Sequence, residues 1–162
     1  MAKGRTDNRK RWHTRRKKTT QNNITMNPSL LTQIVSMKLK DMPSLVKAFT
    51  DEKGVPHQYS IIEACLRRIL QEMNPGSDHS PHPEQIRTVR RLVYGKGDTI
   101  LIARTGFGKS LILHSFSVLT EKITLQIIPL NKLGDQQVKD ISKLDNTRPC
   151  LLNADSKRRE DC

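Results

Sequence analysis

Residues 98–110 read DTILIARTGFGKS, an apolar run followed at once by a loop that contains two glycines. The run at 99–103 is short and rich in Ile and Leu, which predicts a buried β-strand. The octet at 103–110 has the spacing of a Walker A phosphate-binding loop, with Ala103 at its variable first position. Residues 111–119 (LILHSFSVL) predict a buried helix directly after the loop.

Each residue type in the octet has a chemical reason. Gly106 and Gly108 permit backbone angles that turn successive N–H groups toward an anionic phosphate. Lys109 supplies a mobile positive charge for the terminal phosphates, and Ser110 supplies a hydroxyl that can bind Mg²⁺. The following helix adds the positive end of its dipole. We therefore predict a nucleotide-phosphate site here. The alternative is a chance octet in a glycine-containing turn.

The chain has 162 residues and a net charge of +13, and this charge is distributed unevenly. The first twenty residues hold nine basic residues against one acidic residue, a net charge of +8. Residues 1–24 have almost nothing to bury, which predicts a disordered basic tail. Its basic residues fall in two clusters: Arg9, Lys10 and Arg11, then Arg15, Arg16, Lys17 and Lys18.

These clusters suit nuclear import or contact with nucleic-acid phosphates. The alternative is a solvated tail with no specific partner. The sequence contains no run long enough to cross a bilayer, so no membrane partner is expected. We expect a protein of the nucleus, or otherwise of the cytoplasm.

Residues 25–78 have a helical pattern, with helices predicted at 27–37, at 43–49 and after a capping box formed by Ser60 and Glu63. The stretch NPGSDHSPHP at 74–83 is dense in turn formers and predicts a linker with a boundary near residue 78. The predicted organisation is therefore a basic tail (1–24), a small helical segment with its linker (25–78) and an α/β domain (79–162).

Within 79–162, predicted helices alternate with predicted strands. Helices are expected at 84–93, 111–121 and 131–144, and strands at 99–103, 123–128 and 148–153. This alternation predicts an α/β fold built on a parallel sheet with flanking helices.

Three blocks in order resemble the first part of a DEAD/DEAH-box helicase domain, and are most similar to RecQ-type DNA helicases. They are PHPEQ (81–85), ARTGFGKS (103–110) and PLNKLGDQQV (129–138). The resemblance implies a partial RecA-like domain that binds ATP and Mg²⁺, with Gln85 recognising adenine. The implied nucleotide contacts are Thr105, Gly106, Phe107, Gly108, Lys109 and Ser110, with Ser110 also meeting Mg²⁺. The implied contacts with single-stranded nucleic acid are Pro129, Asn131 and Gln137.

The chain also departs from the family pattern. Pro81 and His82 replace an aromatic-Arg pair, and Gln136 stands where the family favours Asp. The sequence contains no Asp-Glu-x-Asp/His tetrad and no second RecA-like domain, so it resembles an N-terminal helicase fragment in which no catalytic residue is identified. The family reaction is ATP-driven DNA strand separation.

For this chain we expect binding of ATP and of DNA, or RNA, without efficient hydrolysis. The alternatives are a non-catalytic nucleic-acid-binding protein dominated by its basic tail and another phosphate-loop family such as a small kinase.

Overall fold

The computed structural model describes residues 28–129, 131–145 and 147–152, and within these ranges it contains α-helices and short 3-10 turns but no β-strand. The predicted parallel sheet is therefore wrong for the described part of the chain. The predicted basic tail at 1–24 lies outside the described residues.

The N-terminal half forms three helices around residues that the sequence marks as apolar. These helices and turns are α1 (Pro28–Ser36), η1 (Leu39–Asp41), α2 (Met42–Lys47), η2 (Val55–His57) and α3 (Gln58–Met73). The helices predicted at 27–37 and 43–49 are confirmed. The third helix begins two residues before Ser60 because η2 leads straight into it, so the predicted capping box at Ser60 is wrong.

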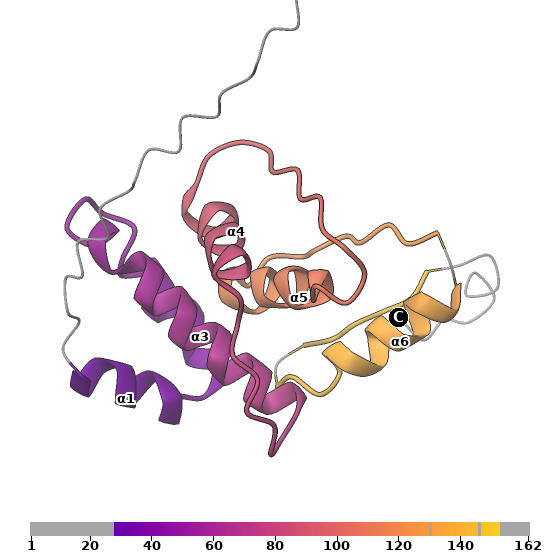
Figure 1. Ribbon diagram of the computed structural model, residues 1–162, viewed down its shortest axis with the longest axis horizontal. Coiled ribbons are helices and arrows are strands. Elements are labelled where there is room, and N and C mark those ends of the chain that lie inside the picture. Colours follow the sequence, from indigo (N-terminus) through magenta and orange to yellow (C-terminus); the bar gives the residue numbers. More distant parts are fainter. Residues whose placement is uncertain (1–27, 130, 146, 153–162) are drawn as a thin grey trace, which may run out of the picture.

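Helix α3 is the centre of the hydrophobic core. Its Ile61, Ile62, Leu66 and Ile69 side chains are fully buried, and α1, α2 and α4 pack against it (Figure 1). Burial of each such side chain contributes about 1.5–3 kcal/mol relative to an exposed position. This packing fixes where the helices of the C-terminal half attach.

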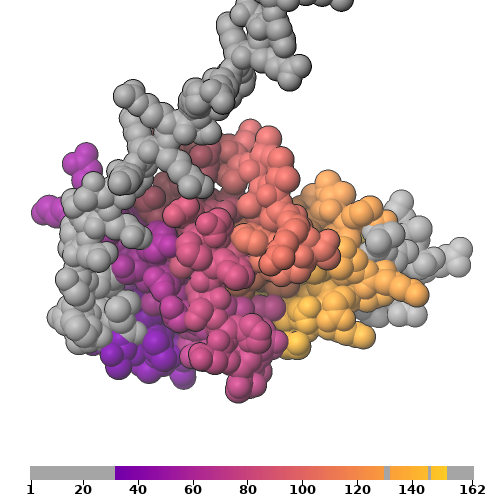
Figure 2. All heavy atoms as spheres, viewed as in Figure 1, coloured from indigo at the N-terminus to yellow at the C-terminus, as the bar shows by residue number. Residues whose placement is uncertain are grey.

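The C-terminal half contributes three further helices: α4 (Pro83–Tyr94), α5 (Lys109–Thr120) and α6 (Asn131–Ile141). Each lies close to its predicted range. Ile86 and Val89 of α4 and Leu111 of α5 join the same buried cluster as α3, so one core spans both sides of residues 74–82. In Figure 2 the last part of the chain, in orange and yellow, forms one end of the packed molecule.

The predicted strands at 99–103 and 123–128 run instead as coil between helices, and residues 148–152 of the third run as coil after α6 (Figure 1). Residue 153 lies outside the described residues. Most large side chains of the first two segments are almost fully exposed: Ile100 at 89%, Ile102 at 94%, Ile123 at 104%, Leu125 at 81% and Ile127 at 90%. A strand obtains its hydrogen bonds only from another strand, which is distant in sequence. An apolar run therefore signals a preference for burial without supplying the partner that a sheet needs.

These exposed side chains predict self-association. Ile123, Leu125 and Ile127 alternate along the chain, a spacing that puts side chains on one face when a segment pairs as a strand. We expect the protein to form concentration-dependent oligomers, because a second copy supplies both apolar surface and backbone partners. Sedimentation velocity of Ile102→Lys/Ile127→Lys should show a shift toward the 18.5 kDa monomer.

The control is Val55→Lys, which changes a half-exposed apolar residue of η2 outside these segments. It should leave the oligomers in place. A wild-type protein that stays monomeric over the whole concentration series would contradict the expectation.

Candidate nucleotide-binding site

The loop before α5 has the backbone that its glycines predict. The N–H of Phe107 donates to the carbonyl oxygen of Arg104 over 3.3 Å and closes a turn. Gly106 and Gly108 have φ angles of 80° and 79°, in the left-handed region that favours glycine. Helix α5 begins at Lys109, and the N–H of Leu111 in its first turn donates to the carbonyl oxygen of Gly108 over 3.1 Å. A glycine turn that leads into a helix N-terminus is an arrangement that favours an anion.

The side chain of Lys109 is exposed and folds back over the loop. Its Nζ donates to the carbonyl oxygens of Ala103 and Arg104, each over 3.0 Å. Both acceptors are neutral, whereas a phosphate oxygen carries charge and accepts a stronger hydrogen bond. The loop therefore holds the cation close to the position where a phosphate would lie.

Gln85, predicted to recognise adenine, is buried beneath the loop with 3% of its surface exposed. Its Oε1 accepts from the backbone N–H of His82 over 2.7 Å, and its Nε2 donates to the carbonyl oxygen of Phe107 over 2.7 Å. A Cβ at Gly108 would lie 2.6 Å from this Nε2. Both ends of the amide are thus engaged within the protein, and the side chain ties the start of α4 to the loop.

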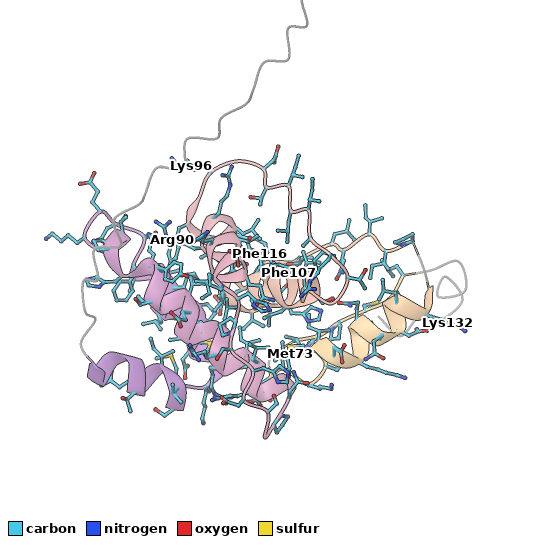
Figure 3. All side chains as sticks on the ribbon, in the orientation of Figure 1. Met73, Arg90, Lys96, Phe107, Phe116 and Lys132 are labelled. Atoms are coloured by element: carbon cyan, nitrogen blue, oxygen red, sulfur yellow. The ribbon has the colours of Figure 1, made fainter. Side chains whose placement is uncertain are left out.

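His82 and Phe107 lie face to face, with ring centroids 5.8 Å apart and planes inclined by 14°. Phe107 is half-buried against the core, and Figure 3 shows it next to α5. The bulky residue inside the octet therefore has a packing partner in His82, the residue just before α4. The sequence alone did not reveal this pair, because helix α4 and the loop that follows it separate the two residues along the chain.

Ser110 is the first member of a hydrogen-bonded chain that leads away from the loop. The Nε2 of Gln137 on α6 donates to the Oγ of Ser110 over 2.8 Å, and the Oε1 of Gln137 lies 2.9 Å from the Nε2 of His114. Because the amide oxygen can only accept, the His114 Nε2 carries the hydrogen. Sequence reasoning missed His114, although it stands out as the one ionisable residue in the apolar stretch 111–119.

His114 is buried, with 2% of its surface exposed. Burial lowers its pKa below the ordinary 6.5, while the hydrogen bond to Gln137 and the charge of Asp140 act in the opposite direction. Its Nδ1 has no hydrogen-bond partner in the described part of the chain, and neither has the buried Oγ of Ser115. The imidazole is therefore neutral and only partly satisfied.

The remaining predicted residues are spread around this centre. Thr105 is exposed in the turn, Pro129 is exposed at the end of a coil segment, and Asn131 is the first residue of α6. Gln137, predicted to contact nucleic acid, instead has its amide engaged by Ser110 and His114. The predicted nucleic-acid contacts of the tail lie outside the described residues: Arg9, Lys10, Arg11, Arg15, Arg16, Lys17 and Lys18.

In the residues that the structure covers, three or more His, Cys, Asp or Glu side chains do not gather as they would to hold a metal ion. A search of the same residues for helices long and apolar enough to span a bilayer finds none. Comparison of the chain with family models, curated proteins and solved structures finds no match in any of the three.

The burial of His114 predicts a pH-dependent stability. Its folded pKa is lowered, so below pH 6.5 the unfolded chain binds a proton that the folded chain does not. Stability should therefore be present above about pH 6.5 and fall as the pH drops through that value, by up to about 1.4 kcal/mol per pH unit. Urea unfolding between pH 8 and pH 5 measures this slope, to an order of magnitude.

Replacing the imidazole by a side chain that does not titrate, His114→Gln, should flatten the slope. The matched control is His79→Gln, at an exposed position, which should keep the wild-type slope. The explanation fails if the wild type and His114→Gln lose stability in parallel as the pH falls.

Proposed function

We propose that this chain is a helicase-type protein that binds ATP with Mg²⁺ at residues 103–110 and also binds nucleic acid. The observation that supports the nucleotide site best is the exposed Lys109 ammonium, held over a glycine loop at the start of α5. A cation, a left-handed turn and a helix N-terminus together favour a phosphate. The proposal does not depend on a parallel sheet, since α4 and α5 hold the loop.

The residues at the loop fit Mg²⁺ delivered with a nucleotide. Mg²⁺ binds through one or two protein oxygens, keeps several waters and takes its other ligands from phosphates. The Ser110 hydroxyl would supply the protein oxygen, and Lys109 would neutralise the terminal phosphates. When bound, the ion would draw charge from the phosphates.

Hydrolysis is expected to be slow. The sequence contains no Asp-Glu-x-Asp/His tetrad to hold Mg²⁺ and position the attacking water. Positioned charges supply most of the transition-state stabilisation in phosphoryl transfer. We therefore propose nucleotide binding with turnover near background, and no residue of the chain is given a catalytic role.

Removal of the Lys109 ammonium tests the nucleotide site. Titration of a fluorescent ATP analogue with Mg²⁺ should show that Lys109→Ala weakens binding by about 10- to 100-fold, the value of a charged hydrogen bond. Lys96→Ala is the control, because Lys96 is an exposed lysine on the loop after α4 (Figure 3). Equal affinity of wild type and Lys109→Ala would place any nucleotide elsewhere.

Nucleic-acid binding is proposed to come mainly from the basic clusters of residues 1–24. A net charge of +8 within twenty residues suits a phosphate backbone and import into the nucleus. This charge also favours a second candidate function, a non-catalytic nucleic-acid-binding protein in which the loop is inert. The two functions differ in whether ATP binds at all.

A salt series measures the part played by the tail. Each neutralised phosphate adds about 0.9 to the slope of log affinity against log salt. Replacing all seven clustered basic residues of the tail by Gln in the full chain should lower the slope for duplex DNA by up to about six. Lys122→Gln/Lys139→Gln, at two exposed positions of which the first follows α5 and the second lies on α6, is the control. Equal slopes for the tail variant and wild type would leave the tail as an import signal or a solvated end.

A further inference from the structure

The hydroxyl of Ser110 is already engaged in the structure, and its partner lies on a different helix. Gln137 of α6 donates its amide N–H to the Ser110 Oγ over 2.8 Å, and Gln137 in turn accepts from buried His114. Ser110 and His114 are four residues apart on α5, so they lie on the same face of that helix. One glutamine therefore connects both residues to α6.

A Mg²⁺ ion at Ser110 would change what this oxygen can do. The ion takes a lone pair, withdraws electron density and makes the hydroxyl a poor acceptor and a strong donor. It also repels the partial positive charge on the amide hydrogens of Gln137. The present direction of the hydrogen bond, from Gln137 to Ser110, is therefore incompatible with a metal-bound hydroxyl.

We propose that Gln137 is a positioning residue for Ser110. The side-chain amide of Gln137 turns over when Ser110 binds nucleotide-bound Mg²⁺. In this way α6 senses whether the loop is occupied. This proposal rests on the proposed nucleotide site. After the turn, Ser110 O–H donates to Oε1 of Gln137, and the amide N–H donates to Nε2 of His114. The imidazole then loses the hydrogen at Nε2 to solvent water and gains one at Nδ1 from solvent water, so one N–H bond breaks, one forms and its net charge is unchanged.

The surroundings of His114 allow this exchange. Its Nδ1 has no hydrogen-bond partner among the described residues, so it is an unpaired acceptor before the change and an unpaired donor after it. Nδ1 is thus unpaired in both states. Its lack of a partner therefore does not strongly favour either tautomer. Asp140, whose charge acts on His114, lies on α6 with Gln137.

The tautomer of His114 can be read directly by nitrogen-15 NMR of the histidine side chains, assigned with His114→Gln. In the free protein the hydrogen should lie on Nε2. Addition of a non-hydrolysable ATP analogue with Mg²⁺ should move it to Nδ1, whereas the analogue with a chelator should not. A tautomer that stays on Nε2 while Mg²⁺ and nucleotide are bound overturns the proposal and leaves the nucleotide site standing.

Two variants on α6 test whether Gln137 carries the signal. Gln137→Met keeps the side-chain length but has no amide, so the His114 response should be lost when the variant is saturated with the nucleotide analogue and Mg²⁺. Gln136→Met is the matched control, because Gln136 is exposed and its amide donates to Asp140 and not to Ser110 or His114 in the described part of the chain. A full His114 response in Gln137→Met overturns the proposal. If the wild type shows no Mg²⁺-dependent nucleotide binding and Lys109→Ala behaves like the wild type, both the proposed nucleotide site and its coupling to α6 are overturned.

Discussion

The shape of the candidate site depends on one buried amide. Gln85 of α4 accepts from the N–H of His82, just before that helix, and donates to the carbonyl that precedes Gly108, so a single side chain joins the beginning of α4 to the loop before α5. Because the amide is buried, loss of either bond would leave a polar atom away from water at a cost of about 1–3 kcal/mol. The close approach also requires a residue without Cβ at position 108.

Apolar packing provides the platform on which this amide acts. Ile86 and Val89 of α4 and Leu111 of α5 share a buried cluster with α3, so the two helices that flank the loop are fixed to the same core. Within the described residues, the loop is held by helices and not by the edge of a sheet. Its neighbours in the sequence, the coil segments with exposed Ile and Leu, contribute little to holding it.

The helices were predictable from the sequence because helical periodicity is a local signal, and the observed bounds of α4 and α6 lie close to the expected ones. The glycine angles of the loop were predictable for the same reason. The strands were not, because a strand at 99–103 needs a partner that the run itself does not specify. Gln85 and Gln137 reach partners 22 and 27 positions away, and only the folded chain shows which atoms they meet.

The contacts of Lys109 also determine how selective the loop is. Its ammonium already has two acceptors in the backbone of its own loop, so a ligand of the proposed site would have to displace them. A ligand that binds the ammonium gains only the difference in free energy between its own hydrogen bond and the backbone hydrogen bond that it displaces. A neutral or singly charged molecule gains little from that exchange, whereas a polyanion gains on every oxygen. The backbone carbonyls of the loop would thus compete with weak ligands for the Lys109 ammonium.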